Sequence, residues 1–134
     1  MPSIDLLLLD STTILNSNNI PTGKPISLVY FSPDCEHCQE ETKGILENIK
    51  KLKDVQFYFV TIDSFDRMKV FNKYFKLKNY PNITVGKDIN FSMLRNFEIP
   101  TTPFTLLYDK HKNLRVMIKG IIPTNQLIDQ INKL

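Results

Sequence analysis

The chain of 134 residues contains two cysteines, Cys35 and Cys38, and only two residues separate them. Disulfide exchange needs one thiolate that attacks a sulfur atom and a second thiol close enough to release the mixed disulfide. The pair follows an apolar run and precedes a stretch with helical spacing of apolar residues. Two cysteines with this spacing at a strand-to-helix junction are typical of a redox-active dithiol. The sequence therefore predicts that Cys35 attacks and that Cys38 resolves.

Three charged or titratable residues around the pair are candidates for tuning its reactivity. The start of a helix favours a thiolate at Cys35, because unpaired N–H groups and the helix dipole face it there. An imidazolium at His37 would also favour the thiolate and make the disulfide more oxidising. The carboxylates of Asp34 and Glu36 act in the opposite direction. The alternative for His37 is a solvated side chain without a tuning role.

The cysteine pair has two other interpretations, a buried structural pair and half of a metal site. A tetrahedral zinc site usually needs four ligands. The second histidine, His111, lies far along the chain in a polar turn, where we expect it to be exposed. We therefore predict no metal and no cofactor.

The hydropathy pattern predicts the elements that position the cysteines. Residues 26–31 (ISLVYF) lie between two prolines and form an apolar run apart from Ser27, which indicates a strand buried on both faces. Helical spacing of apolar residues then predicts a helix over about 35–53, with Asp34 as its N-cap. Residues 55–62 (VQFYFVTI) form a second buried strand. Such a strand-helix-strand unit favours a parallel pair with a right-handed crossover.

The rest of the chain completes an α/β domain. We predict a strand at 4–9, a loop or loose hairpin over 11–25, a helix from 65 to 75, a short strand at 83–85 and a short helix within 89–97. Strands at 104–108 and 114–119 should form an antiparallel hairpin, followed by a last helix that Thr124 caps. This order implies one domain, 1–134, with a mixed sheet and helices on both faces. Residues 1–22 form an N-terminal strand and loop, and 23–134 form the core.

A second informative segment is 99–104 (IPTTPF). Pro103 directly precedes a predicted buried strand, which is a favourable place for a cis bond. A cis Thr102–Pro103 bond would leave the backbone of Thr102 available to an extended peptide. An ordinary trans proline is the alternative.

Composition and charge exclude several function classes. The net charge of +3 is spread over many lysines, which disfavours nucleic acid as a partner. Lys69, Lys73 and Lys76 are predicted to be a solvated helix face. No apolar run approaches the roughly 18 residues of a membrane span. The longest aliphatic stretch, 6–9, is too short for a signal-peptide core, so we expect no transmembrane or targeting segment in this sequence.

The chain resembles the thioredoxin superfamily and, within it, the TlpA/ResA-like thiol-disulfide oxidoreductases of bacterial envelopes. The stretches that carry the resemblance are GKP, LVYFSPDCEHCQEE, VTID, FEIPTTPFTLLYDKHKNL and Gly120, which span most of residues 23–134. The resemblance implies a thioredoxin-like fold with a helix and strand inserted before the cis-proline and a strand added at the N-terminus. It also implies protein disulfide or dithiol substrates, a redox partner, a monomer, and the bacterial cell envelope or periplasm.

The resemblance assigns site residues one by one. The active-site pair corresponds to Cys35 and Cys38, and the cis-proline to Pro103 with Thr102 before it. The acidic residue shortly after the second cysteine corresponds to Glu41, a candidate for proton handling.

The chain also departs from the family pattern. Asp34 replaces the usual aromatic residue before the first cysteine. Val29 stands where thioredoxins place a buried acid. By helical pattern alone, Glu40 and Glu41 are predicted to be solvated carboxylates.

The predicted function is a thiol-disulfide oxidoreductase that exchanges disulfides with protein substrates through Cys35 and Cys38, with Thr102 and Pro103 holding the peptide. Two alternatives remain. Two thiolates can hold Cu(I), which allows a copper-handling protein of the same fold. A redox-silent binding module would keep the fold without turnover.

Overall fold

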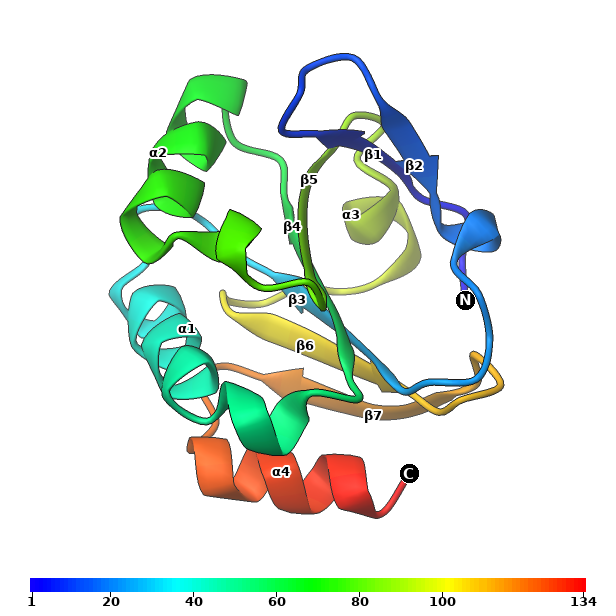
Figure 1. Cartoon of the computed structure of the whole chain (residues 1–134). Helices are drawn as coiled ribbons and strands as arrows, with labels where there is room; N and C mark the ends of the chain where they lie inside the picture. Colours follow the sequence, from blue (N-terminus) through cyan, green and yellow to red (C-terminus); the bar gives the residue numbers. More distant parts are fainter.

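The computed structural model describes every residue of the chain, Met1–Leu134. Seven strands form one mixed sheet in the order β2-β1-β5-β4-β3-β6-β7, and four α-helices flank it (Figure 1). The strands are β1 Asp5–Leu8, β2 Ile14–Asn16, β3 Ile26–Tyr30, β4 Gln56–Thr61, β5 Ile83–Asp88, β6 Phe104–Tyr108 and β7 Leu114–Lys119. The helices are α1 Glu36–Glu47, α2 Phe65–Phe75, α3 Ser92–Asn96 and α4 Thr124–Asn132. The predicted thioredoxin-like α/β fold is confirmed.

Strand β3 lies inside the sheet, next to the central strand β4, and it pairs in parallel with β4 and antiparallel with β6. All five of its residues are buried, including the polar Ser27, as the mainly apolar pattern predicts. Successive side chains alternate between the two faces of a strand. Val29 therefore packs in one core cluster, whereas Leu28 and Tyr30 pack in the other.

The two faces of the sheet carry unequal layers. Helices α1, α2 and α4 cover one face, and α3 lies on the other (Figure 1). The apolar spacing within each helix explains this packing, since Ile45 of α1, Phe71 of α2 and Leu127 of α4 all enter one core cluster. Met93 of α3 enters the second cluster. The thicker layer therefore contains the helix that follows the cysteine motif.

Helix α1 ends earlier than the apolar spacing predicts. It stops at Glu47, and residues Ile49–Leu52 form a separate 3-10 turn, η2. Asn48 leaves helical geometry between them, and its side-chain amide donates a hydrogen bond to the carbonyl of Gly44. Such local side-chain bonds compete with helix continuation. Apolar residues keep their burial through the break, which is why periodicity alone did not reveal it.

The predicted cap of α4 is also wrong. Pro123 holds the N-cap position, and Thr124 is the first helical residue. The side chain of Thr124 lies against Gly44 of α1, where a Cβ on the glycine would clash with its hydroxyl. The side chain of Thr124 therefore packs between α1 and α4 and does not cap α4.

The N-terminal segment is more ordered than a loop or loose hairpin. Strand β2 pairs antiparallel with β1, and β1 pairs antiparallel with β5. Because β5 is paired on both sides, it is longer than the predicted 83–85. The ammonium of Lys112, in the β6–β7 turn, donates to the carbonyls of Ser17 and Ile20 at 2.8 and 2.9 Å. These bonds connect the N-terminal segment to the turn between β6 and β7.

Candidate active site

Cys35 occupies the N-cap position of α1. Its backbone is extended, and its sulfur accepts a hydrogen bond from the N–H of Cys38 at 3.2 Å. A turn closed by the Cys35 N–H and the Ser32 carbonyl delivers the chain from β3 to this position. Asp34, the predicted cap, is exposed and lies one residue too early. The cysteine itself therefore caps the helix, where orphan N–H groups face its sulfur.

The two sulfurs lie in different environments. Both cysteines are free thiols; Cys35 is half-buried, whereas only 2% of Cys38 is exposed. Cys38 belongs to the core cluster that includes Val29 and Phe31. Burial, followed by its hydrogen bond with Cys35, raises the pKa of the Cys38 thiol to about 12. At neutral pH the accessible sulfur belongs to Cys35, and Cys38 is held as a protonated thiol.

The second predicted segment lies beside the cysteine pair. The Thr102–Pro103 peptide bond is cis, as expected. The thiol of Cys35 donates a hydrogen bond to the carbonyl of Thr102 at 3.4 Å. The carbonyl of buried Pro103 in turn accepts from the N–H of Gly120 at 2.9 Å. Residues 67 positions apart in the sequence thus meet at one sulfur.

Glu41 differs most from its pattern-based prediction. Only 3% of this residue is exposed, so its prediction as a solvated carboxylate is wrong, while Glu40 is exposed as expected. Burial raises the pKa of the Glu41 carboxyl to about 7, and a hydrogen bond from the N–H of Ile122 partly offsets this shift. That bond is 3.0 Å long. The loop before α4 covers Glu41, and no local feature of the α1 sequence indicates that covering loop.

The three predicted tuning residues lie at the solvent side of the site. Asp34, Glu36 and His37 are all exposed, and none hydrogen-bonds to either sulfur. Asp34 forms an ion pair with Arg67 of α2, which also contacts Asp63 at 3.3 Å. Sequence reasoning missed Arg67, although its spacing of four residues from Asp63 is typical of a helical ion pair.

The structure thus brings Cys35, Cys38, Thr102 and Pro103 together, with Glu41 on the buried side of α1. No group of three or more His, Cys, Asp and Glu side chains gathers in a way that could hold a metal ion. No helix is long and apolar enough to cross a membrane. The arrangement can form and break a disulfide between a reachable and a buried sulfur.

Comparison with known proteins places this geometry in a family. A family model described as a thioredoxin-like domain matches residues 17–134. No curated protein sequence matches the chain.

Solved structures share the fold at low sequence identity. A secreted disulfide oxidoreductase of Mycobacterium tuberculosis, homologous to DsbE of E. coli, has a TM-score of 0.79 at 16% identity, covering 97% of this chain and 95% of that chain. StoA from Bacillus subtilis has a TM-score of 0.72 at 15% identity, covering 96% and 95%. These structures share the thioredoxin-like fold that the sequence predicts. By the match over residues 17–134, the chain belongs to the thioredoxin-like domain family.

Proposed function

We propose that this protein is a thiol-disulfide oxidoreductase that exchanges disulfides with protein substrates through Cys35 and Cys38. The observation that carries the proposal is the asymmetry of the pair. Cys35 is reachable and receives a backbone N–H bond at the start of α1, whereas Cys38 is buried behind it. Bond exchange between two sulfurs requires such a division between an attacking and a resolving thiol.

The reaction follows from this arrangement. The Cys35 thiolate attacks one sulfur of a substrate disulfide, and the other substrate sulfur leaves as a thiolate that takes up a proton. Cys38 then loses its proton and attacks the Cys35 sulfur of the mixed disulfide. The substrate departs as a dithiol, and the Cys35–Cys38 disulfide remains, so that two electrons have passed to the substrate. The reverse sequence oxidises a dithiol.

Glu41 is the proposed proton acceptor for the resolving step. With a pKa of about 12, the Cys38 thiol ionises too rarely at neutral pH to resolve quickly without a base. Glu41 follows it by three residues, which places both on the inner side of α1. Its pKa of about 7 is close to the optimum for a group that takes and releases protons near neutral pH.

The remaining predicted residues have electrostatic and binding roles in this proposal. His37 favours the Cys35 thiolate, while Glu36 and Asp34 disfavour it, with Arg67 offsetting the charge of Asp34. The Thr102–Pro103 segment borders the reacting sulfur, as the 3.4 Å bond to the Thr102 carbonyl indicates. An extended substrate could pair with this backbone as an added strand. By analogy with the secreted fold relative, we place the reaction in the bacterial cell envelope.

The direct test is insulin reduction with dithiothreitol as the electron donor, using the wild type, Cys35→Ser and Cys38→Ser. We expect the wild type to accelerate precipitation of insulin chains and Cys35→Ser to be inactive. Reduced Cys38→Ser that is freed of dithiothreitol before insulin is added should accumulate a mixed disulfide with the substrate, visible by non-reducing electrophoresis and mass spectrometry. Full multiple-turnover activity in Cys38→Ser would contradict the assigned roles. A wild type that binds Cu(I) tightly but exchanges no disulfide would favour the copper-handling alternative.

A further inference from the structure

Helix α2 presents a polarised surface beside the active site. Val70 and Tyr74 are 68% and 78% exposed, although both are large apolar residues. They lie four positions apart, so they form one stripe along the outside of the helix. Exposed apolar surface that polar residues surround is a feature of interaction sites.

A groove on one side of this stripe reaches the turn that precedes the redox pair. It has a volume of about 440 Å³ and runs between the start of α1 and α2. Its lining includes Phe71 and Phe75 from α2, and Pro33 and Asp34 from the turn that directly precedes Cys35. Val70 and Tyr74 line the same groove. A segment seated there would therefore be continuous with a substrate at the Cys35 sulfur.

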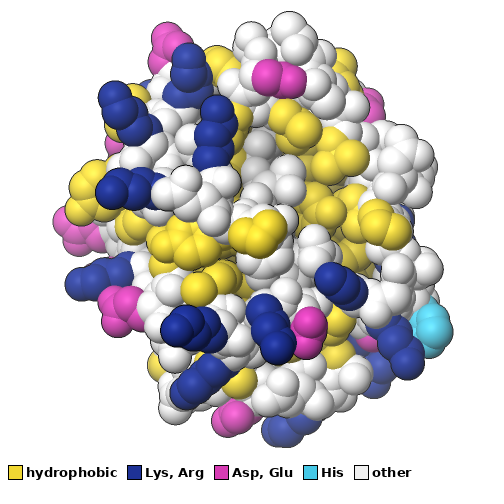
Figure 2. Space-filling view, in the orientation of Figure 1, with side chains coloured by type: hydrophobic (Ala, Val, Ile, Leu, Met, Phe, Trp, Pro, Cys, Tyr) yellow, Lys and Arg dark blue, Asp and Glu magenta, His cyan; other side chains and the backbone are white.

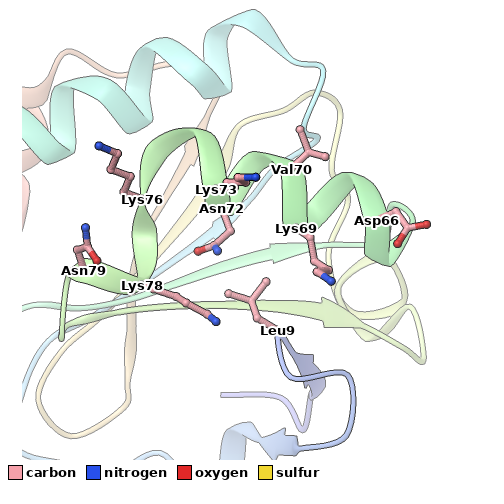
Figure 3. A pocket seen from close by; sticks show the side chains of 9 residues that line it. All are labelled: Leu9, Asp66, Lys69, Val70, Asn72, Lys73, Lys76, Lys78 and Asn79. Carbon is pink, nitrogen blue, oxygen red and sulfur yellow. The ribbon is translucent and has the colours of Figure 1, made fainter.

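The other side of the stripe carries positive charge. Lys69 and Lys73 precede the two stripe residues, and with Lys76 and Lys78 they line a second hollow of about 620 Å³. Figure 2 shows these basic side chains gathered over α2, and Figure 3 shows Lys69 and Lys78 reaching toward Leu9. None of the four lysines forms an ion pair, and Asp66 is the only acid that lines the hollow.

The flank of the stripe toward α1 is mainly acidic. A hollow beyond Tyr74 and Phe75 is lined by Glu36 and Glu40, with Lys43 as the one cation. The stripe thus separates a basic flank from a mainly acidic one. A partner with carboxylates would be attracted to the lysine side and repelled from the α1 side, which fixes its orientation.

We propose that α2 is the docking surface for the substrate protein, and that it binds an acidic segment of that protein. An apolar side chain of the segment covers Val70 and Tyr74, and its carboxylates face Lys69 and Lys73. The lysines are then more than a solvated helix face. This inference rests on the proposed exchange function, because the docked segment delivers a disulfide or dithiol to Cys35.

The test compares two synthetic peptides, each carrying one cysteine as a mixed disulfide with 2-mercaptoethanol. One peptide has phenylalanine and glutamates near the cysteine, and the other has glutamine in place of each glutamate. Acid-quenched mass spectrometry follows their reduction by the reduced protein. We expect the acidic peptide to react about tenfold faster at low salt, with the advantage lost at high salt, as for electrostatically steered association.

Substitutions in α2 test whether this helix causes the faster reaction of the acidic peptide. Lys69→Gln/Lys73→Gln should remove the advantage of the acidic peptide, whereas Lys50→Gln/Lys51→Gln, with the same charge change on exposed residues of η2, should keep it. Tyr74→Ser should slow both peptides by severalfold, whereas Met117→Ser on exposed β7 should not. Thermal melts of all variants verify that they fold.

The outcomes separate the two proposals. Equal rates for the two peptides, or a preference that survives in Lys69→Gln/Lys73→Gln, would overturn the docking surface. Binding to vesicles of anionic lipid that depends on the same lysines, without any peptide preference, would assign the surface to a membrane and also overturn it. Absence of reaction even with bis(2-hydroxyethyl) disulfide, which needs no docking, would instead refute the exchange function.

Discussion

The carboxylate of Glu41 accepts a hydrogen bond from the backbone N–H of Ile122 at 3.0 Å. This bond joins the helix that carries both cysteines to the loop before α4. It holds a titratable group in the interior, where its pKa is raised to about 7. Several properties of the protein should therefore depend on pH in a defined way.

The first prediction concerns the stability of Glu41→Gln. Because the pKa of Glu41 is higher in the folded state than its ordinary 4.5, wild-type stability should fall as the pH rises from about 4.5 to about 7. Glutamine can still accept the Ile122 bond but never ionises. Above about pH 7 the variant should be more stable than the wild type by about 2 kcal/mol. This value is smaller than the free energy that corresponds to the whole rise in the pKa of Glu41 at about 1.36 kcal/mol per pKa unit.

Urea denaturation of the reduced proteins at several pH values measures this difference. The two proteins should be nearly equal in stability near about pH 4, below both pKa values. A stability difference that is the same at every pH would show that the carboxyl is not perturbed by burial.

The second prediction concerns alkylation of the reduced protein by iodoacetamide. The thiolate is the reactive form, and a thiol with a pKa of about 12 is ionised only on the order of one part in ten thousand near pH 8. Cys38 is also inaccessible, so Cys35 should be modified alone. Peptide mass spectrometry identifies the modified residue, and unfolding in urea should make both cysteines react. Equal modification of the two cysteines in the folded protein would contradict their assigned environments.

The third prediction concerns His37, which lies exposed in the first turn of α1. A positive charge there stabilises the thiolate of the reduced form and thus raises the reduction potential. His37→Ala should lower the potential by about 10–30 mV, where 30 mV corresponds to about 1.4 kcal/mol.

Redox titration against glutathione at low and at high salt provides the measurement. Because an exposed charge is screened, added salt should shrink the difference between variant and wild type. A potential that His37→Ala leaves unchanged at low salt would remove His37 from the tuning residues.

The fourth prediction concerns the contact between Gly44 of α1 and Thr124 of α4. Alanine is a better helix former than glycine by about 1 kcal/mol. A Cβ at position 44 would nevertheless clash with the Thr124 hydroxyl. We expect Gly44→Ala to destabilise the wild type by about 1–3 kcal/mol, the usual range for overpacking.

A double-mutant cycle identifies the cause. In a Thr124→Ala background the obstructing hydroxyl is gone, so Gly44→Ala should be neutral or stabilising. Urea denaturation of the four proteins gives the coupling energy. An equal loss in both backgrounds would mean that another contact limits the space at Gly44.

The fold was largely predictable because its central elements have strong local signals. The residues of β3 are apolar except Ser27 and lie between prolines, and the β6–β7 hairpin has a polar turn between two strand patterns. The three-residue β2 has no such signal, since its order comes from pairing with β1 and from the side chain of Asn16, which bonds Asp5. Short strands depend on partners that local sequence does not reveal.

The site was predictable where chemistry and spacing coincide. Cys35, Cys38 and Pro103 follow from motif and element order, and the resemblance pointed to Glu41. Its burial did not follow from the helical pattern, because the covering residue Ile122 is 81 positions away. The N-cap was missed for a different reason: aspartate is the commoner cap, but the turn after β3 places the cysteine sulfur at the N–H groups.

The bonds from Lys112 to Ser17 and Ile20 have a consequence for how the chain is made. They join residues 92 to 95 positions apart, and β1 also needs β5 as its partner. Because synthesis proceeds from the N-terminus towards the C-terminus, β1 and residues Ser17 and Ile20 leave the ribosome long before β5 and Lys112 are made. Residues 1–22 are therefore among the last parts of this domain to reach their native positions.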